Sequence, residues 1–349
     1  MKSVHYSDYL QLDKILGAQQ PESELQQQPA HDEMLFIIIH QAYELWFKQI
    51  MYEVDSVHAI LQQPSLNDNS PELQTVVHRL QRTVTILKLL VQQIDVMETM
   101  TPMDFLDFRD MLRPASGFQS WQFKGLEARL GLRFEQRHGQ EYYLSQLRPE
   151  QVALIKRIES EQSLISLLNE WLERMPFLEQ APGWFQAYTD VYRSSLSEKE
   201  KANLEAFDKK FGADHDERIA DQKTFTSLGA DLNRQLSPRA ARAALFIMLY
   251  RGYPMLQLPF QLLNILLEID EQLSTWRYRH MNMVHRMIGT RIGTGGSTGK
   301  DYLKGAVDKH YIFGEIAQLT SFLVERRHLP KLDATMEKRL GFGGMESET

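Results

Sequence analysis

Residues 31–62 read HDEMLFIIIHQAYELWFKQIMYEVDSVHAILQ, and their large apolar side chains recur at steps of three, four and seven. This spacing is the period of an α-helix that buries one face. The positions on that face are Leu35, Ile39, Trp46, Ile50, Val54, Val57 and Leu61. The stretch therefore predicts a long amphipathic helix.

The same helical periodicity continues along almost the whole chain. It predicts further helices at residues 73–97, 102–109, 151–174, 198–210, 238–252 and 259–288. Thr101-Pro102 and Ser237-Pro238 each place an N-cap residue before a proline at the first helical position. Alternating runs of β-branched residues, which are typical of strands, are essentially absent. We predict an all-α fold of long bundled helices.

Composition excludes several classes of protein. The 349 residues include no Cys, which excludes disulfides, iron–sulfur clusters and thiolate-ligated haem. The formal net charge of −7 lacks the basic excess of a nucleic-acid-binding protein. No apolar run approaches the roughly 20 residues of a membrane span, and the first residues contain no apolar targeting segment. We expect a single domain over residues 1–340, a mobile tail at 341–349, a cytoplasmic location, and neither nucleic acid nor membrane as a partner.

Two histidines occupy apolar helix faces. His280 interrupts a stripe that comprises Ile269, Leu273, Trp276, Val284 and Met287. It is either a core imidazole that is hydrogen-bonded to a neighbour or an axial haem ligand, because a neutral imidazole in an apolar pocket suits iron. His40 shares a face with Phe36, Tyr43 and Phe47, so it is either a core histidine or a residue that faces a bound ligand. Residue pattern alone leaves both pairs of alternatives open.

Arg109 is the candidate for binding an anionic group. It follows Phe105 by one helical turn, so both side chains share a face. A guanidinium binds a carboxylate through two parallel hydrogen bonds, although an exposed arginine more often forms a surface salt bridge, here with Asp104 or Asp107. The turn that follows contains small residues, including Ser116, and these allow a ligand to approach closely.

Residues 293–300 read GTGGSTGK and superficially resemble a phosphate-binding loop. A Walker A loop requires Gly where this chain has Thr294, and Ser or Thr where it has Asp301. The pattern therefore argues against a nucleotide site. It instead predicts a flexible loop rich in backbone N–H donors, which could close over an anionic group.

Three blocks of sequence together resemble the tryptophan 2,3-dioxygenase family. They are residues 31–48, residues 107–120 and residues 276–297. Their order and spacing match from about Tyr6 to Pro330, which is nearly the whole chain.

The resemblance implies an all-α homotetramer with a pocket for haem b, which is ferrous in the active state. The implied reaction inserts both atoms of O2 across the indole C2–C3 bond of L-tryptophan to give N-formyl-L-kynurenine, the first step of the kynurenine pathway of tryptophan catabolism. The amino-terminal segment, residues 1–30, would help to line the active site of a neighbouring subunit.

The resemblance also implies roles for individual residues. His280 would be the proximal ligand of the haem iron, His40 would hydrogen-bond the indole N–H, and Ser116 would lie near the haem. The residues expected to bind the amino acid are Phe36 and Phe105 at the indole, Arg109 at the carboxylate, Thr294 at the ammonium or carboxylate, and Tyr6, Tyr9 and Leu10 from the adjacent subunit.

Three alternatives remain beside this interpretation. The chain could be a haem-binding sensor or carrier without turnover, a haem enzyme that acts on another indole, or a purely structural helical protein. The basic residues Arg277, Arg279 and Arg286 would suit haem propionates, although a solvated helix face is the more frequent fate of such residues.

Overall fold

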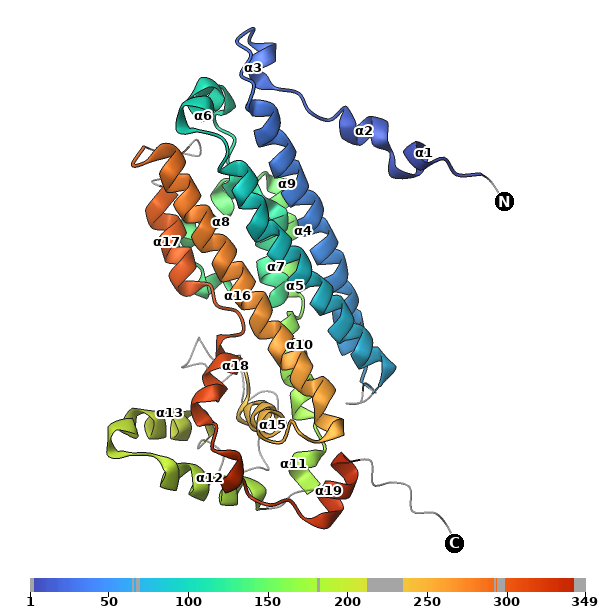
Figure 1. The fold of residues 1–349 in the computed structure, drawn as a ribbon, viewed down its shortest axis with the longest axis vertical. Helices are drawn as coiled ribbons and strands as arrows, with labels where there is room; N and C mark the ends of the chain where they lie inside the picture. Colours follow the sequence, from blue (N-terminus) through green and yellow to red (C-terminus); the bar gives the residue numbers. More distant parts are fainter. Residues whose placement is uncertain are drawn as a thin grey trace.

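The computed structural model describes residues 3–64, 66, 70–180, 183–211, 235–291, 293 and 299–341. Every regular element within these ranges is helical, which confirms the predicted fold class. Three long helices form the body of the molecule: α4 (Glu33–Leu61), α5 (Pro71–Met97) and α16 (Pro254–Ile288). Both α4 and α16 pack against α5, and Figure 1 shows the three lying side by side.

The shorter helices surround this bundle and extend it at one end (Figure 1). In chain order they are α1 (Tyr6–Leu10), α2 (Leu12–Leu16), α3 (Glu22–Leu25), α6 (Pro102–Arg109), α7 (Trp121–Leu130), α8 (Gln140–Ser145), α9 (Pro149–Ser160), α10 (Leu164–Glu173), α11 (Phe177–Gln180), α12 (Trp184–Ser195), α13 (Lys201–Phe211), α15 (Pro238–Leu249), α17 (Gly299–Lys309), α18 (Gly314–Gln318) and α19 (Ala334–Leu340). None of the helices that the structure describes is long and apolar enough to cross a membrane.

Capping residues account for the helix starts that the sequence predicted. At α6, the Thr101 hydroxyl accepts from Asp104 N, while the Asp104 carboxylate accepts from Thr101 N at 2.8 Å. At α15, Ser237 Oγ accepts from Ala240 N at 3.1 Å. Each cap satisfies backbone donors that have no partner within the helix, so both helices begin where predicted.

Two predicted boundaries are wrong. The expected helix at 151–174 is two helices, because the chain extends at Glu161 and Ser163 then caps α10. The last long helix begins at Pro254 rather than Pro259, which lies inside it. A proline within the second turn removes only one backbone hydrogen bond, and the packing of a 35-residue helix tolerates that loss. Of the described helices with ten or more residues, α7, α12 and α17 were not predicted, and neither were the short helices α1, α2, α3, α8, α11, α18 and α19.

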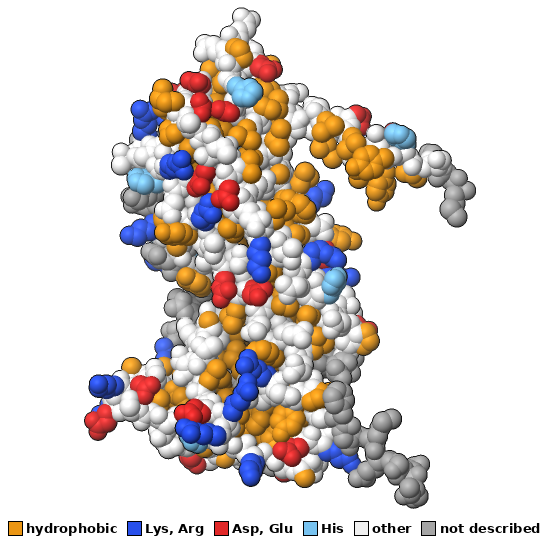
Figure 2. All heavy atoms as spheres, viewed as in Figure 1, with side chains coloured by type: hydrophobic (Ala, Val, Ile, Leu, Met, Phe, Trp, Pro, Cys, Tyr) orange, Lys and Arg blue, Asp and Glu red, His pale blue; other side chains and the backbone are white. Residues whose placement is uncertain are grey.

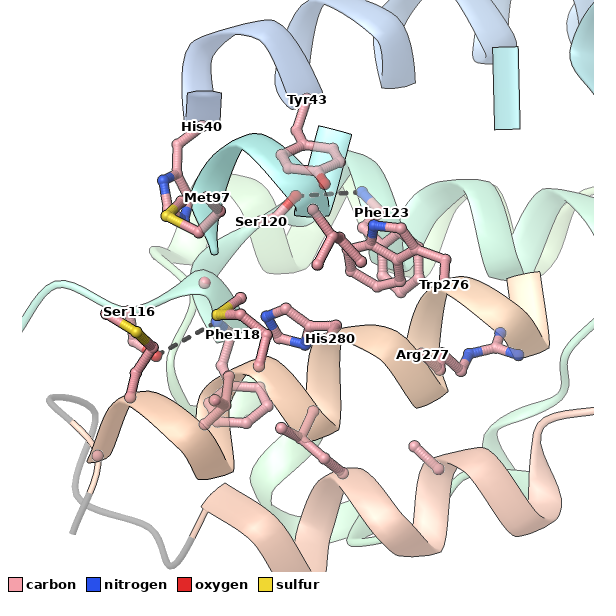
Figure 3. Close-up of a pocket in the computed structure, with 18 of the residues that line it drawn as sticks. His40, Tyr43, Met97, Ser116, Phe118, Ser120, Phe123, Trp276, Arg277 and His280 are labelled. Atoms are coloured by element: carbon pink, nitrogen blue, oxygen red, sulfur yellow. Dashed lines mark hydrogen bonds between the residues drawn. The ribbon is translucent and has the colours of Figure 1, made fainter. Parts of the chain in front are cut away.

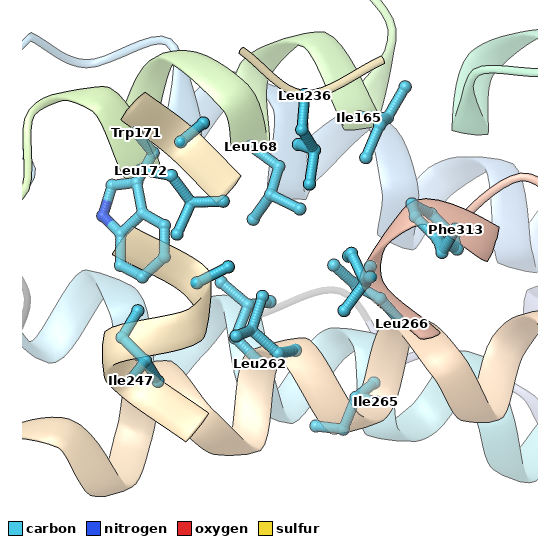
Figure 4. Packing of buried hydrophobic residues seen from close by; sticks show 14 of the residues in the cluster. Ile165, Leu168, Trp171, Leu172, Leu236, Ile247, Leu262, Ile265, Leu266 and Phe313 are labelled. Carbon is cyan, nitrogen blue, oxygen red and sulfur yellow. The ribbon is translucent and has the colours of Figure 1, made fainter. Parts of the chain in front are cut away.

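The main hydrophobic core lies where α4, α5, α10, α15 and α16 meet. Figure 4 shows its packing around Trp171, Leu262 and Leu266, which are buried along with most of their neighbours. A smaller apolar cluster lies towards the other end of the bundle and comprises Ile39, Met97, Met100, Phe108 and Met287. The large core holds the long helices in place, and the small cluster adjoins the cavity described below.

A buried carboxylate also joins distant parts of the chain at α18. Glu315 accepts hydrogen bonds from Lys210 Nζ and from the backbone N–H groups of Gln235 and Leu236. The Glu315 side chain thereby holds together Lys210 and the segment that begins at Gln235, which are 25 positions apart in sequence. The ion pair lies beside the large core and not at the cavity.

We expect His58 to make folding stability depend on pH. This α4 side chain is 3% exposed. Its burial, followed by the charge of Arg129, lowers its pKa from 6.5 to about 4. Because the unfolded chain binds a proton more readily, stability from this group is complete above about pH 6.5 and is lost as the pH falls towards 4. When the pH is lowered from about 7.5 to about 5, the free energy of unfolding should therefore fall by about 2 kcal/mol less in His58→Gln than in the parent protein. Urea denaturation at each pH measures both free energies. Equal losses in both proteins would contradict this assignment.

Candidate functional site

One mostly apolar cavity of about 280 Å³ opens among the helices at the end of the bundle near the smaller cluster. This volume is close to the lower end of the range for small-molecule pockets, roughly 300–1,000 Å³. Its walls come from α4, α5, α6, α7, α16 and α17, and Figure 3 shows side chains from several of them turned towards a common space. Segments far apart in sequence therefore meet around one ligand-sized space.

His280 lines this cavity from α16. Its ring stacks on Trp276 at a centroid separation of 5.0 Å and an interplanar angle of 4°. Its Nδ1 is buried without a hydrogen-bond partner among the residues that the structure describes. Burial, and then the proximity of His40, lower its pKa to about 4, so the imidazole is neutral at physiological pH. The alternative of a core histidine satisfied by a neighbour does not describe this side chain.

His40 lines the same cavity from α4, so two helices contribute one histidine each (Figure 3). Its Nδ1 lies 2.7 Å from Phe36 O. A carbonyl only accepts, so Nδ1 carries the proton and Nε2 presents a lone pair. Burial lowers its pKa below the usual 6.5, which favours this neutral form. The side chain is thus arranged to accept a hydrogen bond from a ligand N–H.

Aromatic rings form the wall beside His40. Phe36 lies 4.1 Å from the His40 ring and 5.7 Å from Phe105, centroid to centroid. Phe108 packs edge-on against Phe105 at 5.4 Å. These separations are typical of favourable aromatic pairs. The wall is therefore suited to a flat apolar ligand, and the two phenylalanines predicted for it, Phe36 and Phe105, both line the cavity.

Arg109 and Ser116 also line the cavity. Arg109 is the last residue of α6 and is 4% exposed, so it is a buried arginine and not one on the surface. Ser116 Oγ accepts from Phe118 N at 3.3 Å, which shapes the turn before α7 (Figure 3). A buried guanidinium in an apolar cavity is a specific site for a carboxylate.

Charged side chains concentrate on the wall built by α7. Glu127 Oε1 pairs with Arg277 Nη2 at 2.6 Å, and Glu127 Oε2 pairs with Arg137 Nη1 at 2.7 Å. Burial alone would raise the pKa of Glu127, but Arg277, His310 and Arg137 hold it well below its usual range. Lys124 lies on the same wall, and burial lowers its pKa to about 8. Cations thus outnumber carboxylates in this cluster.

Not every predicted site residue reaches the cavity. Tyr6, Tyr9 and Leu10 form α1, and none of them lines the cavity of their own chain. Thr294 lies outside the described residues. Of the three arginines of α16, Arg277 points inward to Glu127, Arg279 pairs with Asp95 and Glu98, and Arg286 is exposed, as the alternative of a solvated helix face expects. Arg277 lies on a different face of α16 from Arg279 and Arg286, which are two helical turns apart.

Several cavity residues were not predicted. The charged wall residues Lys124, Glu127, Arg137 and His310 belong to this group. The pair Glu127 and Arg277 is separated by 150 positions in sequence, so no local spacing could indicate it. Trp276 was recognised only as part of an apolar stripe, yet it stacks on His280 and lines the cavity.

Comparisons with known proteins agree with this geometry. A family model described as tryptophan 2,3-dioxygenase matches residues 1–323. The chain is 44% identical to the tryptophan 2,3-dioxygenase of Bdellovibrio bacteriovorus, covering 97% of this chain and 98% of that protein. It is 43% identical to the enzyme of the same name from Rattus norvegicus, covering 96% of this chain and 86% of that protein. The chain belongs to the tryptophan 2,3-dioxygenase family.

Proposed function

We propose that this protein is a haem-dependent dioxygenase that inserts both atoms of O2 across the indole C2–C3 bond of L-tryptophan to give N-formyl-L-kynurenine. The observation that carries the proposal is the shared cavity of His280 and His40, which also contains the buried Arg109 and an aromatic wall. One histidine is available to a metal, one can accept from an indole N–H, and the arginine can bind a carboxylate.

The residues present fit a haem group. His280 offers a neutral imidazole in an apolar cavity, and its buried Nδ1 has no partner among the described residues. The cluster of Lys124, Arg137 and Arg277 with the single carboxylate of Glu127 carries an excess of positive charge, which suits the carboxylates of a porphyrin. His280 would hold the iron, and Lys124 and Arg137 would face the propionates. When bound, the haem iron supplies O2 binding and activation.

The chain itself supplies binding, orientation and exclusion of water. Arg109 would bind the substrate carboxylate, and the wall of Phe36 and Phe105 would hold the indole ring. Nε2 of His40 would accept from the indole N–H, so it positions the substrate and need not remove a proton. Burial of these groups strengthens each polar contact because little water competes.

Two measurements test the proposal in order. The purified protein reconstituted with haem should show a Soret band, and a protein without one is not a haem enzyme. Ferrous protein with O2 and L-tryptophan should then produce the absorbance of N-formyl-kynurenine. A Soret band without that product would favour a haem sensor or carrier, and product from tryptamine at equal efficiency would favour an enzyme for other indoles.

His40→Ala should weaken turnover without abolishing it. The variant leaves the indole N–H without its acceptor, which costs about 1–3 kcal/mol, and it also loses the ring that packs on Phe36. We expect kcat/KM to fall about tenfold to a hundredfold, measured by product formation under saturating O2. Complete inactivity with haem and L-tryptophan still bound would show that His40 has an obligatory chemical role.

We further propose a homotetramer in which the arm of residues 3–20, which contains α1 and α2, lines a neighbouring subunit's cavity. The arm stands away from the bundle in Figure 1, and Figure 2 shows apolar side chains gathered along it. Tyr9 is 75% exposed, and Tyr6 and Leu16 are exposed as well. A second apolar stripe at steps of seven, Ile38, Leu45 and Tyr52, is exposed along α4. Such exposed apolar surface is typical of a face that another protein covers.

Combined Tyr6→Ala and Tyr9→Ala replacement should lower kcat/KM while leaving the Soret band unchanged. The expected loss is about tenfold, because two aromatic contacts to the substrate would be missing. Mixing this variant with the Arg109→Met variant should restore part of the activity. Some mixed sites would combine Arg109 of one chain with Tyr6 and Tyr9 of the other. Leu323→Ala is the control, because this exposed residue lies far along the chain from the arm. A monomer by light scattering, or no restoration on mixing, would refute the exchange.

A further inference from the structure

The Glu127 network is a second polar centre beside the histidine pair. Its members are Glu127 on α7, Arg277 on α16, and Arg137, Lys124 and His310, all of which line the cavity. The Glu127 side chain is 3% exposed, and the other four are also buried. An isolated buried carboxylate is costly, so a cluster of this kind indicates a requirement beyond solubility or surface charge.

Arg277 joins two separate parts of the chain through one guanidinium. Its Nη2 pairs with Glu127 Oε1 at 2.6 Å, while its Nη1 donates to His310 O at 2.9 Å. Only a planar, forked side chain can make both bonds at once. The turn of α16 that carries Arg277 is therefore fixed against α7 on one side and against the chain after α17 on the other.

His310 extends the same network. Its Nε2 accepts from His138 N at 3.0 Å, so Nδ1 carries the proton and lies 3.6 Å from Glu127 Oε1. Arg137 also donates to Lys124 O at 3.3 Å and lies over the ring of Tyr143. Four segments of the chain thus converge on one carboxylate.

The Glu127 network contacts α16 within one helical turn of His280. Arg277 precedes His280 by three residues, which is just under one helical turn, and Trp276 stacks on the His280 ring. A metal-binding histidine is usually oriented by a hydrogen bond from its second ring nitrogen. Nδ1 of His280 has no such partner among the described residues. Ring orientation therefore depends on where α16 places the turn and on the stacked indole.

We propose that Glu127 is a positioning residue, which through Arg277 fixes the α16 turn of Trp276 and His280 and so sets the orientation of the iron ligand. The inference rests on the proposed haem function. It makes a different prediction from the simpler role of attracting anionic propionates. Removing the negative charge of Glu127 would strengthen attraction for propionates, whereas it would release Arg277 and loosen the turn.

The test compares Glu127→Gln with Glu315→Gln in the haem-loaded protein. Glu315 is a matched control, because it is also a buried carboxylate that pairs with a cation, but it lies away from the cavity. Haem dissociation is measured by transfer to excess apomyoglobin, and the iron–histidine stretching band is measured by resonance Raman spectroscopy. We expect Glu127→Gln to release haem about 10- to 100-fold faster and to shift the band, whereas Glu315→Gln changes neither.

A second pair of variants decides the matter if Glu127→Gln does not fold. Arg277→Lys keeps the charge but cannot reach both Glu127 and His310 O, whereas Arg279→Lys alters a surface ion pair on the same helix. Only Arg277→Lys should accelerate haem loss and shift the band. The inference would be overturned, and the proposed function would stand, if Glu127→Gln lost haem more slowly than the parent. The same holds if either variant matched its control in haem loss and in the position of the band. A parent protein that binds no haem would overturn the proposed function with it.

Discussion

The His280→Ala protein is expected to lose its haem and all measurable turnover. His280 is the neutral imidazole of the α16 stripe in the cavity, and removing it leaves the iron without its proposed ligand. The Soret band of the reconstituted protein should disappear after gel filtration. Added imidazole should restore part of the band, because the truncated side chain leaves room for a free ligand.

A control separates loss of the ligand from loss of the fold. His58→Gln alters another buried histidine that does not line the cavity, so it should keep both haem and turnover. Circular dichroism of both variants should retain the helical signal. Retention of haem and of full turnover in His280→Ala would refute the assignment of His280 as the iron ligand.

Arg109→Met is expected to give the second large loss, this time in substrate recognition. The guanidinium is buried in the cavity wall, so the substrate carboxylate would be left without a countercharge after its removal. Breaking a buried charge pair costs about 3–5 kcal/mol, which corresponds to a fall in kcat/KM of about a hundredfold to a few thousandfold. Haem content should be unchanged.

The decisive measurement is the preference for L-tryptophan over tryptamine, which lacks the carboxylate. The parent should discriminate strongly, and the ratio of the two kcat/KM values should collapse in Arg109→Met. Arg113→Met is the matched control, since Arg113 is an exposed arginine nearby that pairs with Asp110. An unchanged preference in Arg109→Met would assign carboxylate binding to another residue.

Local patterns predicted the three longest helices but few of the contacts between helices. The α4 and α5 helices were predicted to within two residues because their apolar faces repeat at the helical period. His280 and His40 were candidates because each is a polar residue on an apolar helix face, and Arg109 was a candidate because it shares a face with Phe105. Thr294 stays a prediction, and so does the exchange of Tyr6, Tyr9 and Leu10 between subunits.

The Glu127 network could not be predicted in the same way. Its partners come from α7, α16 and the residues around positions 137 and 310, and each looks like an ordinary charged residue in its own segment. Helix α7 was itself missed. Which charges become buried is decided by tertiary packing, so spacing within one helix carries no information about it.

The length of α16 makes the proposed iron site sensitive to the packing at the far end of the helix. This helix runs without a break from Pro254, beside the large core, to His280 at the cavity, a distance of about 39 Å at 1.5 Å per residue. A rigid tilt of about 1.5° around its first turn would displace the backbone at His280 by about 1 Å, and the packing of α16 on α5 and the two bonds of Arg277 oppose such a tilt. A misplacement of that size can lower turnover about a hundredfold. Substitutions in the core that packs against the first turns of α16 would then change turnover, although they lie at the opposite end of the helix from His280.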